Sequence, residues 1–321
     1  MKTKRIAITG GTGFVGHHVA RELLTHGHHV VLISRTRETS ALQIKHPNHV
    51  RVERIGLNDP TALARVFAGC DAVVHCAGIN REVGEQTYRA VHIDGTRLVI
   101  AACKTAGVPK LSITSFLRAR PDCGSAYHES KFAAEQLVRK SGLTYTVFKP
   151  GVIYGKGDHL LDHLSHAFHT FPLFAFVGMK DQILRPLAVE DFARMVAAAA
   201  MTDELDNKTL AVTGPEELTL SAAVKRVANA VGKHPRYYFH APLWFHYVLA
   251  WICETTMKVP LISLGQVKIL SEGITDPCGD YELPPIHLRP NTPFMESFIR
   301  TQLPEPRRFG FRDLRLANAL G

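Results

Sequence analysis

The sequence predicts an α/β fold, built on a doubly wound parallel sheet and followed by a smaller C-terminal lobe. Apolar strand-like runs alternate with helix-like stretches through the first half of the chain, and this pattern loosens after Pro150. Such alternation is typical of a parallel sheet with helices on both faces. The 321 residues suffice for one large domain and an appendage. We therefore predict domains at 1–150 and 151–321, the second partly interleaved with the first.

The expected elements follow from the spacing of apolar residues and from turn residues between them. In the first half we expect strands at 5–9, 29–34, 50–55, 72–75, 111–114 and 145–148, and helices at 14–26, 60–68, 85–106 and 127–141. In the second half we expect a helix at 189–201, a strand at 208–213 and a helix at 219–232. Thr219 would cap the last helix and Gly232 would stop it.

A glycine-rich turn follows the first expected strand directly and opens the first helix. Its glycines are spaced three apart, which suits a pyrophosphate: the first allows a tight turn, the second a close approach of the backbone, and the third close packing of helix on strand. The helix N-terminus adds free N–H groups and partial positive charge. We therefore predict a Rossmann-type dinucleotide site. Its expected cofactor-binding residues are Gly10, Thr12, Gly13, Phe14, Val15 and Gly16.

The end of the second strand bears on which dinucleotide binds. NAD sites carry a carboxylate about 20 residues beyond the glycine loop, for the ribose 2′-hydroxyl. Here the run 33–37 is Ile-Ser-Arg-Thr-Arg, without a carboxylate. Ser34, Arg35 and Arg37 could instead bind a 2′-phosphate, which favours NADP(H). The alternative, NAD(H), remains open if one arginine is solvated and the other stacks on adenine.

A tyrosine and a lysine four residues apart point to proton transfer. Tyr127 and Lys131 would share one face of the helix at 127–141. An ammonium group beside a phenol stabilises the phenolate, so we expect a lowered pKa of Tyr127 and exchange of a proton with a substrate carbonyl or hydroxyl. Ser115 follows the strand at 111–114, and its hydroxyl could hold the substrate oxygen beside Tyr127. The alternative is that Tyr127 and Lys131 are an ordinary pair on the surface of a helix, without a catalytic role.

Together these motifs resemble the short-chain dehydrogenase/reductase superfamily. The glycine loop, the run 71–78 (Asp-Ala-Val-Val-His-Cys-Ala-Gly), Ser115 and the pair Tyr127–Lys131 carry the likeness, and the run 149–155 (Lys-Pro-Gly-Val-Ile-Tyr-Gly) is similar to its extended and atypical, epimerase/dehydratase-like branches. The resemblance implies a nicotinamide cofactor and a substrate-binding C-terminal lobe. It also implies further cofactor-binding residues, namely Cys76, Ala77, Gly78, Lys149, Pro150 and Val152.

Within these branches the chain most resembles the nucleotide-binding accessory subunit of respiratory complex I and its bacterial relatives. Three positions depart from the family pattern. His92 stands where asparagine is common, Leu57 replaces an aspartate after the third strand, and Lys149 replaces an arginine. In place of the asparagine, His92 could still relay protons as a fourth catalytic residue. The alternative is that this chain lacks a proton relay.

Composition limits the partners. Net charge is +9 with a pI near 9.3, which favours anionic partners. The basic residues form no long block, so we do not expect the protein to bind nucleic acid. Six scattered cysteines and no signal-like or membrane-spanning stretch predict a cytoplasmic protein with reduced thiols. His159, His163 and His166 would share a helix face, but we expect solvated imidazoles there and no metal site.

The run 242–253 (PLWFHYVLAWIC) is unusually apolar and aromatic. We expect a helix packed over the substrate lobe. The alternative is a helix that binds a partner or a membrane surface, with the protein peripheral at the inner membrane. A homodimer could form through the helices at 85–106 and 127–141.

Three functions remain open. The first is an NADP(H)-dependent oxidoreductase that transfers a hydride to or from a carbonyl or alcohol, with Ser115, Tyr127 and Lys131 as proton machinery. The second is a cofactor-binding structural or assembly protein of a respiratory-type membrane complex, with little turnover. The third is a sugar-nucleotide epimerase or dehydratase, for which the C-terminal half offers no pattern.

Overall fold

The computed structural model describes residues 2–35, 41–273 and 275–315. The chain forms two compact units. The first comprises residues 1–151, 189–212 and 277–290, and the second comprises residues 152–188, 213–276 and 291–321. The chain therefore leaves the first unit after Gly151 and returns to it twice.

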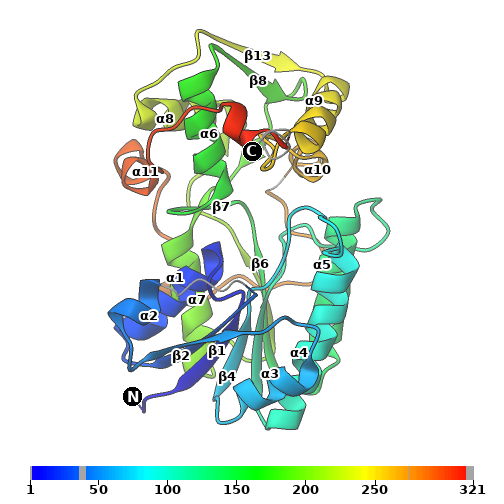
Figure 1. Ribbon diagram of the computed structural model, residues 1–321, viewed down its shortest axis with the longest axis vertical. Coiled ribbons are helices and arrows are strands. Elements are labelled where there is room, and N and C mark those ends of the chain that lie inside the picture. Colours follow the sequence, from blue (N-terminus) through cyan, green and yellow to red (C-terminus); the bar gives the residue numbers. More distant parts are fainter. Residues whose placement is uncertain (1, 36–40, 274, 316–321) are drawn as a thin grey trace. The chain divides into compact units, whose positions relative to one another are not determined.

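A seven-stranded parallel sheet forms the centre of the first unit (Figure 1), in the order β3-β2-β1-β4-β5-β6-β11. The expected strand at 208–213 joins this sheet at its edge, beside β6. Strand order reverses between β1 and β4, where such sheets bind ligands beyond the carboxyl ends of the strands. The predicted Rossmann-type, doubly wound fold is confirmed. The strands are β1 (Arg5–Thr9), β2 (His29–Ser34), β3 (Val50–Arg54), β4 (Ala72–His75), β5 (Lys110–Thr114), β6 (Thr144–Pro150) and β11 (Lys208–Val212).

Helices cover both faces of the sheet (Figure 1). On one face α1 packs against α7, which lies over β4, β5 and β6; on the other, α4 packs between α3 and α5. The expected helix at 85–106 begins only at Arg89, because the hydrogen bonds between Val83 and Gln86 close a turn before it, and it opens with a π-helical stretch. The helices are α1 (Phe14–Thr25), α2 (Ala41–Lys45), α3 (Pro60–Phe67), η1 (Arg89–Asp94), α4 (Gly95–Ala106), α5 (Ala126–Arg139), α7 (Val189–Met201) and η2 (Ile286–Leu288).

The second unit is built from helices and three two-stranded sheets. The paired strands are β7 (Ile153–Tyr154) with β10 (Leu187–Ala188), β9 (Ile183–Leu184) with β12 (Leu218–Thr219), and β8 (Leu173–Val177) with β13 (Tyr237–Ala241). The helices are α6 (His159–Thr170), α8 (Leu220–Val231), α9 (Leu243–Thr256), α10 (Leu264–Ser271), α11 (Glu296–Gln302) and η3 (Phe311–Asp313). As predicted, the Thr219 hydroxyl caps α8, and Gly232 ends it in the left-handed conformation.

Burial of apolar side chains holds the first unit together. Its core includes Ala7, Val31, Val73, Leu111 and Val147, one from each of five adjacent strands. All six cysteines are free thiols, as expected. Within the described parts of the chain, no helix has the length and apolar character needed to cross a membrane.

Candidate functional site: the carboxyl edge of the parallel sheet

The glycine loop forms a backbone cradle at the start of α1. Gly10 has a φ of +67°, and a Cβ there would lie 2.9 Å from the backbone of Ala77. A Cβ on Gly16 would collide with the Gly10 carbonyl oxygen. Gly13 is the N-cap of α1, and no side chain caps this helix. The first amides of α1 therefore lack a side-chain acceptor, and the cradle fits the pyrophosphate of a dinucleotide.

The end of β2 is linked to this loop and carries cationic side chains. Thr12 donates a hydrogen bond of 2.8 Å to the buried Ser34 hydroxyl. Arg35 is exposed. Arg54 on β3 is the register partner of Ser34, is also exposed, and was missed by sequence reasoning. The nearest carboxylate on β3, that of Glu53, forms an ion pair with Arg51. Arg37 lies outside the described residues.

The segment after β4 lies between the glycine loop and α5. The Cys76 amide donates to the Thr9 carbonyl at 3.1 Å, which fixes this segment against the end of β1. Burial raises the pKa of Cys76 to about 11, so its side chain is a neutral thiol. A Cβ on Gly78 would lie 3.1 Å from Lys131 Nζ and 3.5 Å from His92 Nε2. Gly78 thus leaves room for both of these side chains.

Four polar residues at spacing i, i+4, i+8 and i+12 form one stripe along α5: Tyr127, Lys131, Glu135 and Arg139. Lys131 Nζ donates to the Thr114 carbonyl at the end of β5 (3.1 Å) and lies 6.0 Å from the centre of the Tyr127 ring. Burial lowers the pKa of Lys131 to about 8. The stripe therefore begins at the carboxyl edge of the sheet. Tyr127 and Lys131 share one face of α5, as the sequence predicts.

The expected lowering of the Tyr127 pKa is not found. Tyr127 is only 9% exposed, and this burial, together with the nearby Tyr88 phenol, raises its pKa above the ordinary value. Desolvation disfavours the charged phenolate. The phenol is therefore neutral at working pH.

The Ser115 hydroxyl lies elsewhere than expected. It donates a hydrogen bond of 2.5 Å to Glu135 Oε1, on the inner side of α5. The next residue, Phe116, faces Tyr127 instead, with ring centroids 5.5 Å apart in an edge-on arrangement. Consecutive residues leaving a strand point to opposite sides. The expectation that Ser115 lies beside Tyr127 is therefore corrected: an aromatic ring stands there.

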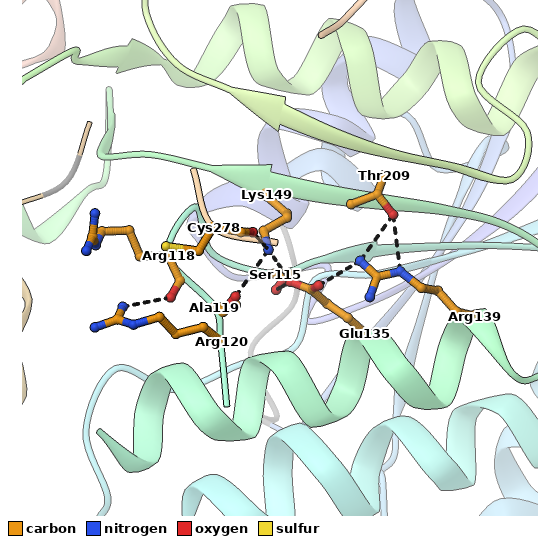
Figure 2. Close-up of polar contacts among 9 residues, drawn as sticks. All are labelled: Ser115, Arg118, Ala119, Arg120, Glu135, Arg139, Lys149, Thr209 and Cys278. Atoms are coloured by element: carbon orange, nitrogen blue, oxygen red, sulfur yellow. Dashed lines mark hydrogen bonds and ion pairs between the residues drawn. The ribbon is translucent and has the colours of Figure 1, made fainter. Parts of the chain in front are cut away.

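Glu135 is the centre of a buried ion cluster (Figure 2). Its carboxylate is fully buried and lies 2.9 Å from Arg139 and 3.4 Å from Lys149 Nζ. Arg139 also donates to Thr209 Oγ1. Lys149 Nζ donates to the carbonyls of Ala119 (3.2 Å) and Cys278 (2.7 Å). The cluster joins α5, β6, β11 and the returning segment 277–290.

This cluster corrects one expected cofactor ligand. Lys149 is 1% exposed, and burial lowers its pKa. Its ammonium group is held by Glu135 and two carbonyls rather than turned toward the glycine loop. The neighbouring Pro150 is buried, and its carbonyl accepts from the Leu117 amide at 2.8 Å. Val152 belongs to the second unit, where its carbonyl accepts from the Leu187 amide.

His92 is a buried, neutral histidine with both ring nitrogens engaged. The Ile79 amide donates to Nε2 (3.1 Å), so Nδ1 carries the proton and donates to the Ser130 hydroxyl at 2.9 Å. Ser130 in turn donates to the Tyr127 carbonyl. Burial lowers the pKa of His92 to about 2. Both ring nitrogens are thus engaged, and neither has a free lone pair to accept a further proton.

A second buried histidine, His75, has the opposite tautomer. Thr96 donates its only hydroxyl proton to the His92 carbonyl (2.6 Å), so it must accept from His75 Nε2 at 3.1 Å. His75 Nδ1 then accepts from the Thr9 hydroxyl at 2.6 Å. Burial lowers the pKa of His75 to about 3. Buried hydrogen bonds thus connect β1, just before Gly10, with the helix that carries Tyr127.

The histidine stripe of the second unit lies on α6, as predicted. The ring centroids of His159 and His163 are 5.8 Å apart, and Nδ1 of His166 lies 3.5 Å from Oδ2 of Asp162. Burial lowers the pKa of His163 to about 4. Among the described residues, no group of three or more histidine, cysteine or acidic side chains is arranged to hold a metal ion.

The fold and this edge of the sheet define a class of protein, the NAD(P)-binding Rossmann proteins. A family model described as NAD(P)H-binding matches residues 10–164. The chain belongs to the extended short-chain dehydrogenase/reductase superfamily. The family model supports an NAD(P)-binding protein.

Several relatives agree with this assignment. The ceramide reductase of Caulobacter vibrioides is 28% identical over 72% of this chain and 72% of its own length. Subunit 9 of the 1 alpha subcomplex of mitochondrial NADH dehydrogenase [ubiquinone] in Dictyostelium discoideum is 21% identical over 91% and 82%. The chain spans only 23% of the length of the uncharacterized mycobacterial proteins that it also matches, at 26% identity.

Among solved structures, MoeE5 in complex with UDP-glucose and NAD has a similar fold. The TM-score is 0.63 over 74% of this chain and 85% of that one, at 20% sequence identity. At this identity the likeness concerns the fold alone.

Proposed function

We propose that the protein is an NADP(H)-dependent oxidoreductase that interconverts a carbonyl and an alcohol, with Tyr127 as the general acid and base. The observation that carries this proposal is the placement of Tyr127 and Lys131 one helical turn apart, both buried, with Lys131 at the end of β5. Nicotinamide supplies or accepts the hydride when it is bound.

In this proposal the chain's own residues bind and orient the cofactor and move one proton. The glycine loop holds the pyrophosphate, and Lys131 binds the nicotinamide ribose, as in similar dehydrogenases. Tyr127 gives its phenolic proton to the substrate oxygen, or takes it back in the reverse direction. A neutral phenol suits reduction, because the acid must carry its proton when the hydride arrives.

The Phe116 ring beside Tyr127 supports an apolar substrate (5.5 Å between ring centroids). A ring wall favours a hydrocarbon chain and offers no hydrogen bond to a sugar hydroxyl. The ceramide reductase among the relatives is named for a lipid substrate. We therefore place long-chain ketones first among the substrates to be tried, and sugar nucleotides last.

The preference for NADP(H) over NAD(H) rests on Ser34, Arg35 and Arg54. Both arginines are exposed at the ends of β2 and β3, and Ser34 lies between the glycine loop and Arg54. Their charge suits a 2′-phosphate. Titration of the protein with NADPH and with NADH tests this preference, and equal dissociation constants would count against it.

The test of catalysis is oxidation of NADPH with a panel of long-chain ketones and sugar nucleotides, with the Tyr127→Phe variant alongside. We expect loss of about 10²- to 10⁴-fold in turnover for a lost general acid, with NADPH affinity retained. The exposed Tyr281→Phe variant is the matched control. Full activity of Tyr127→Phe on an accepted substrate would contradict the role of Tyr127.

A second function, a cofactor-binding structural subunit with little turnover, is favoured by one observation. The Ser115 hydroxyl is donated to Glu135 and is therefore not directed at a substrate. The subunit 9 relative belongs by name to such an assembly. NADPH binding without oxidation across the panel, together with co-purification in a membrane complex, would support this function. Purification as a free protein at native levels would count against it.

A further inference from the structure

Helix α9 of the second unit is apolar on two opposite faces. His246, Ala250 and Cys253 are buried, at the spacing of one helix face. On the opposite face Trp244, Trp251 and their neighbours are open to solvent. A helix that is apolar all round is ordinarily enclosed by protein or lipid. The open face is therefore not explained by the packing of α9 within its own unit.

This open face, here called the tryptophan face, is large and uncharged. It consists of Trp244 (67% exposed), Val248 (51%), Trp251 (61%) and Ile252 (44%). No charged residue occurs between positions 243 and 253, and the two tryptophans are the only ones in the chain. Tryptophan is enriched where one side of a residue meets hydrocarbon and the other meets water.

Cationic side chains lie at the C-terminal end of this helix. The Lys258 amide donates to the Asp313 carbonyl (2.8 Å), and Arg315 Nε donates to the Met257 carbonyl (3.1 Å). These bonds hold residues 312–315 beside the end of α9. The side chains of Lys258, Arg312 and Arg315, here called the basic end, are exposed. Of the acidic residues near this end, Asp313 is ion-paired with Arg307, and Glu254 accepts a hydrogen bond from the Leu264 amide.

We propose that the tryptophan face and the basic end dock the second unit onto an anionic membrane surface, with α9 lying in the plane of the headgroups. An apolar face with tryptophans enters the headgroup layer, and cations beside it bind acidic lipids; stable peripheral attachment ordinarily needs both signals. A protein partner would need acidic groups opposite the basic end, whereas an acidic lipid surface supplies them at any position. The proposal concerns a surface and is independent of turnover at Tyr127.

Tryptophan fluorescence of the full chain tests this proposal directly, because both tryptophans lie on the proposed surface. We expect a blue shift of the emission and co-sedimentation with vesicles of phosphatidylcholine and phosphatidylglycerol, little of either with phosphatidylcholine alone, and reversal by high salt. Lys258→Gln with Arg312→Gln should weaken vesicle binding roughly tenfold or more. Trp244→Ser with Trp251→Ser should abolish sedimentation.

Matched variants of the first unit serve as controls. Ile286→Ser removes an apolar side chain that is 82% exposed, and Arg21→Gln with Lys45→Gln removes two exposed cations. Circular dichroism would confirm that each variant is folded. The proposal is overturned if the protein stays in the supernatant with unchanged emission, or if the control pair weakens binding as much as the basic-end pair. It is also overturned if the blue shift grows with protein concentration without vesicles, since a second copy then covers the face.

Discussion

The carboxyl edge of the sheet is built differently beside β1 and beside β5. At the glycine loop the close contacts join backbone to backbone, with Gly10 against Ala77 and Gly16 against the Gly10 carbonyl. Beside β5 they join ionisable side chains, with Glu135 between Arg139 and Lys149. In the first region an added Cβ at Gly10 or Gly16 would collide with backbone, and the loop carries no charge. The second region is held by the attraction between opposite charges.

This difference indicates which part of a dinucleotide-binding fold can vary without loss of the fold. A backbone cradle depends on the absence of side chains, so it is suited to the pyrophosphate of either dinucleotide. A buried ion cluster depends on all its members at once, because removing one leaves the others uncompensated. We expect the two regions to respond to substitution in opposite ways: the loop through affinity, and the cluster through stability.

The largest effect should follow from breaking the cluster. Glu135→Ala leaves the cations of Arg139 and Lys149 without their carboxylate, which costs about 3–5 kcal/mol of unfolding free energy. Urea unfolding measures this loss. The matched control is Glu22→Ala, which removes a partly exposed carboxylate 3.9 Å from His26 and should cost about 1 kcal/mol or less. Equal losses in the two variants would show that the cluster contributes no more than a surface pair.

The next effect should follow from filling the cradle. Gly16→Ala puts a Cβ against the Gly10 carbonyl. If the loop relieves this overpacking, about 1–3 kcal/mol, by moving away from its pyrophosphate-binding geometry, the same free energy is lost from cofactor binding. We expect the NADPH dissociation constant to rise roughly 5- to 150-fold, as measured by quenching or enhancement of cofactor fluorescence. Gly310→Ala is the control, since a Cβ there meets nothing within 4 Å. Unchanged affinity in Gly16→Ala would mean that the cofactor does not use this loop.

The cradle could be predicted from the sequence because it depends on spacing along the chain. Three glycines at intervals of three, after a strand, suffice to define its backbone. The stripe on α5 also lies within reach of the sequence. Glu135 follows Tyr127 and Lys131 at the same interval of four, and a carboxylate in a buried stripe indicates a buried ion pair. The sequence therefore carries a signal for this ion pair.

The partners of the stripe could not be predicted in this way. Lys149 bonds to the carbonyl of Cys278, 129 residues further along the chain, and only the returning segment 277–290 brings the two together. Arg54 lies beside Ser34 by the register of β3 on β2, which the sequence leaves open. Alternation alone would have turned Ser115 and Phe116 to opposite sides, but not decided which of them faces Tyr127.

A smaller, pH-dependent effect should come from His92. Its pKa is about 2 in the folded chain, against an ordinary value of 6.5. Below pH 6.5 the unfolded chain therefore binds a proton that the folded chain does not. Stability falls as the pH is lowered through this window, by about 1.4 kcal/mol per pH unit for one such histidine.

The variant His92→Asn tests this titration. It should flatten the dependence of unfolding free energy on pH by that amount, measured at pH 6.5 and about two units below. His75, buried in the same way, keeps its own contribution. The exposed His26→Asn variant is the control. The readout is the slope of unfolding free energy against pH, because any loss of packing lowers the unfolding free energy equally at both pH values. An unchanged slope would mean that His92 takes up a proton in the folded chain.

The smallest effect should come from the exposed arginines at the ends of β2 and β3, which supply the positive charge that the glycine loop lacks. Arg35 is exposed, so its contact with a 2′-phosphate is screened by water and contributes about 1 kcal/mol or less, roughly fivefold in affinity. Arg35→Ala should raise the dissociation constant of NADPH by that factor and leave that of NADH unchanged. Arg35→Ala with Arg54→Ala should bring the two constants together, and the exposed Arg21→Ala variant should change neither. If NADH binding weakens in parallel, Arg35 contacts the shared part of the dinucleotide, and the selectivity for a phosphate lies elsewhere.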